Sequence, residues 1–318
     1  MSVMGFTKKI LFFVFLFSFS MFFQSGLARA EKSELSLTPF LIKGDVTRGQ
    51  TFQKNIVVAN TSETQKLLSY SIQDFLPLGD NGSVEFVPVG KYASGATSLD
   101  KWIVITKQPD FELLPGQSTV VEFNITVPKE SESGAHFGAF VFTLSDSYPT
   151  LGQTLVQYQA ATLLIFDLDR SYERGLINKF SLSNTGDHSK VLDFNTEFSN
   201  VGTSSLQPKG DVRIFNWRHK EVDRDYVNKN ALTVLPSSRR IFANHIPGLY
   251  FGWYSADLHL TYGSKRLETS KTISFWVGPS SETVFLWFVL LISMTIGLYL
   301  FIKYYNRWLI SRHQKNIK

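Results

Sequence analysis

Hydrophobic and polar residues alternate over much of the chain between positions 31 and 280. Val121, Phe123, Ile125 and Val127 take every second position, with Glu, Asn and Thr between them. Alternation with a period of two is typical of a β-strand that has one buried face and one face in water. Similar stretches, bounded by Gly, Pro, Asn or Ser, occur at residues 56–59, 68–73, 192–198 and 254–262. The pattern predicts antiparallel strands throughout this region and no comparable helix before residue 284.

Two short segments each occur twice along the β-rich region. VANTS at residues 58–62 is echoed by FSNVG at 198–202, and LPGQS at 114–118 is echoed by LPSSR at 235–239. A fixed order of recurring segments indicates a repeated structural unit. We therefore predict an all-β fold of two tandem immunoglobulin-like β-sandwiches, residues 31–148 and 149–280, with the boundary in the segment SDSYPTLGQ.

The segment LPGQ has the residues of a tight turn. Pro115 fixes φ near about −65° at the second turn position, and Gly116 can adopt the φ > 0 that a type II turn requires at the third. We expect this turn to set the register of the strand that follows it.

The N-terminal segment has the features of a signal peptide. Lys8 and Lys9 precede an apolar run over residues 10–23, and Ala28-Arg29-Ala30 follows as a cleavage pattern. We predict a signal peptide over residues 1–30. The alternative is an uncleaved anchor helix, which is disfavoured because the run is shorter than the ~20 residues that cross a bilayer.

A second apolar run begins at Val284 and ends at Ile302 without a charged residue. At ~1.5 Å per residue, residues 284–302 cover roughly 30 Å, the thickness of the hydrocarbon core of a bilayer. The tail over residues 303–318 has five Lys or Arg residues and no acidic residue, and the positive-inside rule places such a tail in the cytoplasm. The sequence predicts a single-pass cell-membrane protein that contacts lipid through residues 284–302. Its N-terminal region would lie outside and its C-terminus in the cytoplasm.

Composition narrows the function further. The chain has 32 Lys and Arg residues, but eight of them lie in the two end segments, which leaves 24 against 27 acidic residues in between. The isoelectric point of about 9.2 therefore reflects membrane topology and does not indicate a nucleic-acid partner. The absence of cysteine excludes disulfides, thiolate zinc sites, cysteine nucleophiles and a lipid-modified cysteine.

The first predicted sandwich resembles a known family. Residues 36–75 (SLTPFLIKGDVTRGQTFQKNIVVANTSETQKLLSYSIQDF) and 113–142 (LLPGQSTVVEFNITVPKESESGAHFGAFVF) are similar to the N-terminal domain of bacterial WxL-interacting proteins. The order of signal peptide, peptidoglycan-binding-type domain, second immunoglobulin-like domain, membrane helix and basic tail is also similar. The resemblance implies attachment at the cell wall and contact with other surface proteins, and it marks no individual binding residue.

No catalytic motif stands out. The chain has no Gly-x-Ser-x-Gly, no His-Glu-x-x-His and no Gly-rich phosphate loop, and His136 and His259 stand alone, which favours a structural or solvent-facing role. Glu221, Asp223 and Asp225 could offer oxygen ligands to calcium, but the segment lacks the turn glycine and the distal glutamate of a calcium loop. Alternation on an exposed strand explains these three residues as well.

Two further groups allow a functional or a structural interpretation. Asp167 and Asp169 share one side of a predicted strand; a glycosidase would need a cleft between its carboxylates, whereas a charged strand edge needs none. Phe251 and Trp253 lie on a polar strand face and could stack on a sugar or a partner protein, or be covered by a loop or by the other domain.

The sequence favours a non-catalytic, membrane-anchored surface protein without a cofactor or a catalytic or metal site. Its expected partners are a cell-wall polymer such as peptidoglycan, another surface protein, or both. The alternatives are a β-sandwich hydrolase acting on polysaccharide and a chaperone-like module that pairs strands with its partner.

Overall fold

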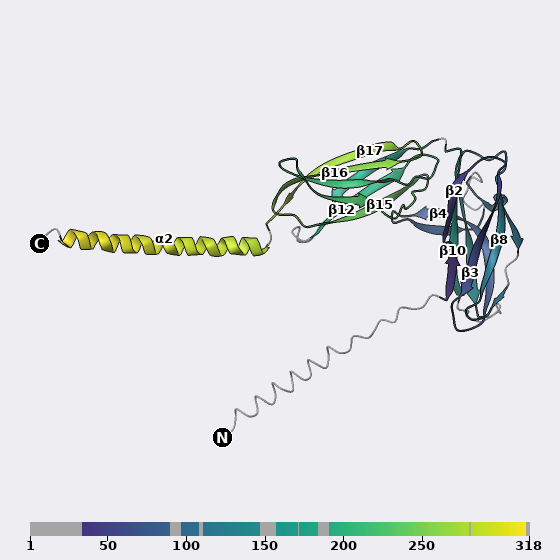
Figure 1. The fold of residues 1–318 in the computed structure, drawn as a ribbon, viewed down its shortest axis with the longest axis horizontal. Coiled ribbons are helices and arrows are strands. Elements are labelled where there is room, and N and C mark those ends of the chain that lie inside the picture. Colours follow the sequence, from purple (N-terminus) through teal and green to yellow (C-terminus); the bar gives the residue numbers. More distant parts are fainter. Residues whose placement is uncertain are drawn as a thin grey trace, which may run out of the picture.

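The computed structural model describes residues 34–89, 97–107, 111–146, 157–170, 172–183, 191–279 and 281–315. The predicted signal peptide and the last three residues of the tail lie outside the described residues. Two β-sandwiches and one C-terminal helix make up the described chain, which confirms the predicted fold class (Figure 1).

The first sandwich has two sheets, one antiparallel throughout and one antiparallel except at its β2 edge. One sheet has the strand order β1-β3-β8-β6, and the other has the order β2-β10-β9-β4-β5, with β7 paired to β4. The chain passes from the first sheet to the second between β1 and β2, and β2 then runs parallel to β10. The strands are β1 (Leu35–Thr38), β2 (Leu41–Val46), β3 (Thr51–Asn60), β4 (Lys66–Leu78), β5 (Ser83–Val87), β6 (Ile103–Lys107), β7 (Glu112–Leu113), β8 (Ser118–Thr126), β9 (Gly134–Ser145) and β10 (Gln157–Leu168), with a 3-10 turn η1 (Asp100–Trp102) before β6.

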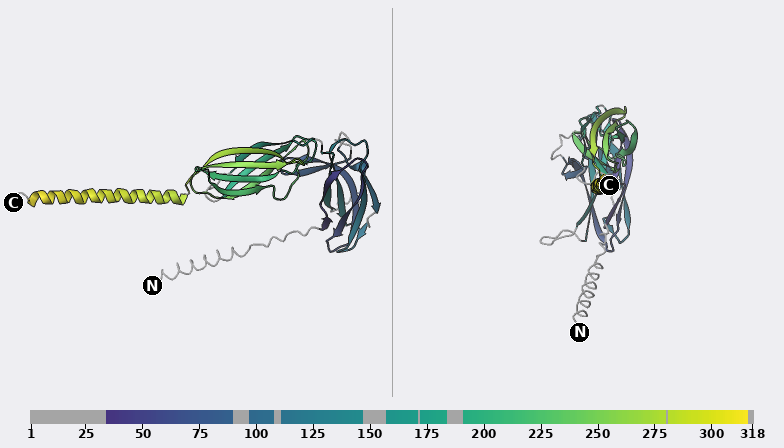
Figure 2. Two further views of the ribbon diagram at one scale, coloured as in Figure 1. Left: turned by 45° about the horizontal axis from the view of Figure 1, so that its top comes forward. Right: turned by 90° about the vertical axis from the view of Figure 1, so that its left-hand side faces the viewer.

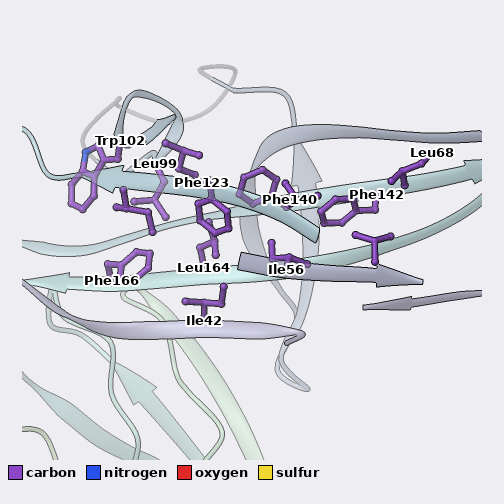
Figure 3. Packing of buried hydrophobic residues seen from close by; sticks show 14 of the residues in the cluster. Ile42, Ile56, Leu68, Leu99, Trp102, Phe123, Phe140, Phe142, Leu164 and Phe166 are labelled. Carbon is purple, nitrogen blue, oxygen red and sulfur yellow. The ribbon is translucent and has the colours of Figure 1, made fainter. Parts of the chain in front are cut away.

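The core of this sandwich forms from the residues that alternate along its strands. Figure 3 shows Phe123, Phe140 and Leu164 pointing into the space between the two sheets, and the rings of Phe123 and Phe140 have their centroids 4.7 Å apart. The predicted face of β8 is fully buried, and its intervening Glu, Asn and Thr residues are not. Strand β9 differs because both of its faces are buried.

The predicted domain boundary is wrong in one respect. It assigns β10 to the second sandwich, but β10 pairs with β9 from Gln157↔Ser145 to Leu168↔Gly134 and with β2 on its other side. The segment SDSYPTLGQ therefore joins neighbouring strands of one sheet. The first strand of the second sandwich begins only at Gly175.

The second sandwich has seven strands in two sheets, with the orders β11-β12-β15 and β14-β13-β16-β17. Its core contains the alternating residues of β12 and β16 that the sequence pattern singled out, including Phe194, Phe198 and Leu258. The strands are β11 (Gly175–Leu182), β12 (Val191–Asn200), β13 (Lys209–Asn216), β14 (Glu221–Val227), β15 (Ser238–Pro247), β16 (Gly252–Tyr262) and β17 (Leu267–Val277).

The two sandwiches use the same buried asparagine at the end of a strand. The Asn60 amide donates to the carbonyls of Thr64 (2.8 Å) and Leu113 (2.9 Å), while its Oδ1 accepts from the Ser62 backbone N–H (3.0 Å). Asn200 repeats each bond: its amide donates to Ser204 (2.8 Å) and Val234 (2.9 Å), and its Oδ1 accepts from the Gly202 N–H (3.0 Å). Both side chains are buried, so the echo between VANTS and FSNVG marks one structural element used twice.

The predicted turn is also present in both sandwiches. Gly116 has φ of 73°, and the Gln117 N–H donates to the Leu114 carbonyl at 3.0 Å, which confirms the turn and its positive φ. In the second sandwich Ser237 occupies the same place with φ of 56°, and the Ser238 N–H donates to the Leu235 carbonyl.

Helix α2 (Ser281–Lys315) follows β17 and contains the predicted membrane run. Its portion Ser281–Arg307 is long and apolar enough to cross a membrane, and none of it is buried in the rest of the chain. The helix leaves the second sandwich at the end opposite the first sandwich (Figure 1). The two sandwiches meet end to side, so that the β-rich part of the chain is bent (Figures 1 and 2).

Candidate functional site

A small apolar cluster joins the two sandwiches. Phe75, Phe137 and Ile165 lie on the outer face of the β2-β10-β9-β4-β5 sheet, and Leu235 from the turn of the second sandwich packs against them. The rings of Phe75 and Phe137 have their centroids 5.1 Å apart. This contact explains why β9 is buried on both faces: one face lines the core and the other lies at the junction.

Hydrogen bonds surround the apolar cluster. The Ala135 N–H donates to the Thr203 carbonyl at 2.8 Å, and a side chain at Gly134 would come within 2.9 Å of that same carbonyl oxygen. On another side the β4–β5 hairpin contacts the second sandwich: the Ile241 N–H donates to the Asp80 carbonyl (2.8 Å). The junction therefore joins backbone to backbone at two separate places, which holds the two sandwiches in a defined arrangement.

Asp167 is a buried acidic group at the junction. Its carboxylate accepts from the Ser205 N–H (2.6 Å) and the Ser205 hydroxyl (2.5 Å), and it pairs with Arg170 (3.1 Å). Burial raises the pKa of Asp167, although the bonds from Ser205 and the charge of Arg170 act in the opposite direction. Arg170 also pairs with Asp45 (2.5 Å) and Glu173 (3.2 Å), so one guanidinium links three carboxylates at the point where the chain enters the second sandwich.

A cleft of about 640 Å³ opens beside this ion-pair network. Strand β2, the end of β10 and the turn after β16 form its walls. Lys43, Lys209 and Arg266 line the cleft, and none of the ion pairs in the described part of the chain includes them. Arg170 and these three side chains outnumber the two lining carboxylates, Asp45 and Asp167, so the cleft has an excess of positive charge.

We call residues 60–66 and 111–117 the tip of the first sandwich. In the second sandwich the corresponding end is the one that forms the junction. The tip turn at Leu114 matches the turn at Leu235, and Leu113 matches Val234 as acceptor for the buried asparagine. Their surroundings differ: Leu235 is 7% exposed at the junction, whereas Leu114 is 57% exposed and Phe111 beside it is 54% exposed. The Leu-Pro turn is thus covered by the neighbouring sheet in the second sandwich and exposed in the first.

A buried lysine supports the tip from within. Lys66 is 4% exposed, and its ammonium pairs with Asp146 (2.6 Å) and Glu34 (2.7 Å) and lies 5.3 Å from the Tyr158 ring centroid. Burial disfavours its charge, but the bonds from the two carboxylates outweigh that effect and raise the pKa of Lys66. These ion pairs fix the tip to the body of the first sandwich.

Exposed aromatic side chains gather at the end of the second sandwich that is next to α2. Phe251 and Trp253, which the sequence singled out, are joined by Tyr250 and by Trp276, whose ring centroid lies 5.2 Å from that of Trp253. Among the described residues neither a loop nor the first sandwich covers them, and Tyr250 is 90% exposed. The sequence pattern did not point to Trp276, although this residue lies directly opposite Trp253 in the pairing of β16 and β17.

The acidic residues of the possible calcium site have other partners. Glu221 pairs with Arg224 (2.9 Å), and Asp225 pairs with Lys229 (2.5 Å) and accepts from Asn244 (2.8 Å). Partial burial opposes the shift, but these two partners lower the pKa of Asp225. In the described ranges no three His, Cys, Asp or Glu residues are grouped to hold a metal ion.

The two aspartates of the possible hydrolase site do not converge. Asp167 faces Ser205, whereas Asp169 lies beyond the strand end with φ of 56°, pairs with Arg48 and accepts from the Ser133 hydroxyl (3.2 Å). The two histidines are also apart. His136 is buried, bonds to the Glu132 carbonyl (2.8 Å) and lies against Trp102, and burial lowers its pKa; His259 is exposed near Glu268.

Comparisons with known proteins give no family. No protein-family model matches the chain, and no curated protein matches it. Several solved structures resemble it weakly. The class 5 fimbriae chaperone CfaA is 12% identical, covers 77% of this chain and 99% of its own, and superposes with a TM-score of 0.37.

Two others are similar in extent. The E. coli chaperone DraB is 11% identical, over 76% of this chain and 96% of its own, with a TM-score of 0.34. The Salmonella enterica SafA pilin in complex with the SafB chaperone is 11% identical, over 77% of this chain and 97% of the other, also with a TM-score of 0.34. Likeness at this level says nothing about what this chain binds.

Proposed function

We propose that the chain is a non-catalytic, membrane-anchored cell-surface protein that binds another surface protein through the tip of its first sandwich. The uncovered turn at Leu114 carries this proposal, because its counterpart at Leu235 is the group that docks on a neighbouring sheet within the same molecule. Exposed Leu and Phe side chains on a rigid turn are suited to a protein partner with an apolar surface. The resemblance to WxL-interacting proteins, which implies contact with other surface proteins, supports the same role.

The intramolecular junction suggests what the partner looks like. Leu235 packs on the outer face of a β-sheet, and the neighbouring loop bonds to the start of a strand through the Thr203 carbonyl. A partner for the tip would therefore be a β-sandwich with an uncovered apolar sheet face. A second copy of this chain does not offer that face, since its own Leu235 already occupies it.

Strand pairing is a second candidate mode of protein binding. Strand β6 forms the edge of its sheet, pairs only with β8 in the described structure and exposes Val104. An edge strand presents backbone N–H and C=O groups that an extended partner segment can bind.

The junction cleft favours a cell-wall polymer as a further candidate ligand. Lys43, Lys209 and Arg266 could bind carboxylate or phosphate groups of such a polymer. Sedimentation of the chain with purified cell-wall polymer tests this idea. We expect Lys43→Gln to reduce the bound fraction and Lys54→Gln, at an exposed position on β3, to leave it unchanged.

Photo-crosslinking on intact cells tests the main proposal. A photoreactive amino acid at position 114 should give an adduct with one surface protein, and the same group at position 104 on β6 should not. An adduct at 104 alone would favour strand pairing and contradict docking through the tip. Adducts of the same proteins at both positions, or none at either, would also contradict it.

A further inference from the structure

The membrane-proximal end of the second sandwich has an unusual surface. Strand β17 ends at Val277, and α2 begins at Ser281, so only a few residues separate this end from the apolar helix. Register places Trp253 opposite Trp276, and Gly252 opposite Val277, at the same end. The loop before β16, with Tyr250 and Phe251, follows β15 there as well.

A fifth aromatic residue belongs to this end. Trp217 directly follows β13, whose last residue is Asn216. Asn216 pairs with Tyr254, the residue after Trp253, so Trp217 lies at the same end of the sandwich. We call Trp217, Tyr250, Phe251, Trp253 and Trp276 the aromatic end; all five side chains are exposed. They are contributed by three separate parts of the sandwich, and all three meet beside the start of α2.

Basic groups accompany these aromatic residues. The Arg218 guanidinium lies 4.4 Å from the Trp217 ring centroid, and His219 and Lys220 follow in the same exposed hairpin tip. Two of the nearby acidic groups have basic partners: Glu221 pairs with Arg224, and Asp193 bonds to His245 at 2.6 Å. Glu282 lies in the first turn of α2 and not in the hairpin. The hairpin tip therefore presents net positive charge beside exposed tryptophans.

We infer that the aromatic end lies in the interfacial layer of the bilayer that α2 crosses, where it orients the ectodomain. Trp and Tyr side chains concentrate at membrane interfaces because one end of the ring system is apolar and the other forms hydrogen bonds. Arg and Lys beside them attract anionic headgroups. This inference rests on the anchoring role of α2 proposed above, and the short segment between β17 and α2 leaves the aromatic end close to the lipid surface.

The lack of cysteine in the natural chain makes a direct test possible. The full chain is reconstituted in lipid nanodiscs, and an environment-sensitive fluorophore is attached to one cysteine at a time. Phe251→Cys probes the aromatic end. Leu267→Cys is the matched control, because it lies at the opposite end of β17, roughly 30 Å away along the strand. Leu291→Cys, inside α2, reports whether the helix is in the bilayer.

Lipids carrying a spin label near the headgroup should quench the fluorophore at position 251 and leave position 267 bright, while lipids labelled deep in the acyl chain quench position 291. Quenching at 291 with equal brightness at 251 and 267 would overturn the inference and leave the anchor intact. An unquenched fluorophore at 291 would overturn the anchor as well. Anionic lipid should increase quenching at 251, and Arg218→Gln should remove that increase.

A glycan is the competing occupant of an exposed aromatic surface. Soluble fragments of cell-wall glycan are added to the chain labelled at position 251 in nanodiscs without spin label. A saturable change in emission, together with no quenching by headgroup-labelled lipid, would show that the aromatic end binds sugar and would contradict its place in the membrane interface.

Discussion

Each sandwich has a buried asparagine at the end of a strand, Asn60 in the first and Asn200 in the second. Replacing either asparagine by aspartate tests whether its amide holds that strand end in place. Asn60→Asp keeps the shape of the side chain but substitutes an oxygen for the amide that donates to Thr64 and Leu113. The buried Leu113 carbonyl and the partly buried Thr64 carbonyl then lose this donor, and a negative oxygen faces both of them, although the Ser62 hydroxyl still donates to Thr64 (3.0 Å). An unmade buried hydrogen bond costs about 1–3 kcal/mol, so the loss at Leu113 alone should cost about that much. That is a large part of the ~5–15 kcal/mol that stabilises a typical domain.

Asn200→Asp should have the same effect in the second sandwich, because its amide makes the corresponding bonds to Ser204 and Val234. The assay is thermal unfolding of the full chain in detergent, followed by circular dichroism, with the exposed Asn230→Asp as control. We expect both core variants to lower the unfolding temperature by on the order of 10 °C. If Asn60→Asp shifts it no more than Asn230→Asp does, the asparagine does not hold the strand end and the correspondence fails.

Three further predictions concern single positions. Gly116→Val should cost about 1–3 kcal/mol of folding stability through its positive φ alone, since no atom of a described residue other than its chain neighbours lies within 4 Å of the added Cβ. Gln117→Val should cost less, and equal shifts in melting temperature would contradict this prediction. Burial lowers the pKa of His136, so the folded chain favours the neutral imidazole. The contribution of this group to folding stability is fully present above its ordinary pKa of about 6.5 and is lost as pH falls below that value. His136→Gln should therefore flatten the decline in melting temperature between about pH 7 and 5. Asp167→Asn keeps an acceptor for Ser205 and removes the buried charge, so its midpoint of denaturation by urea should fall less than that of Asp167→Ala.

Much of the fold follows from the sequence because alternation and turn residues are local signals. The buried face of β8 and the positive φ of Gly116 are both present as expected. The assignment of β10 failed because alternation shows that a strand exists but not which sheet it joins. The loop composition of SDSYPTLGQ fits a linker as well as a connection between neighbouring strands.

The candidate surfaces were less predictable for a related reason. Phe251 and Trp253 stood out as aromatic residues on a polar face, but their position beside α2 depends on the register of β16 and β17. The recurring Leu-Pro turn was visible in the sequence, yet only the junction shows that Leu235 is covered and Leu114 is not. Asp167 likewise gave no sign that its partner would be Ser205 of the other sandwich.

The two proposed surfaces both require the sandwiches to stand outside the membrane on α2, with the basic tail inside. Single cysteines at positions 104 and 318, introduced separately into the cysteine-free chain, test this arrangement with a membrane-impermeant maleimide on intact cells. We predict that position 104 is labelled on intact cells and that position 318 is labelled only after the membrane is permeabilised. Labelling of position 318 on intact cells, with position 104 protected until permeabilisation, would contradict the account.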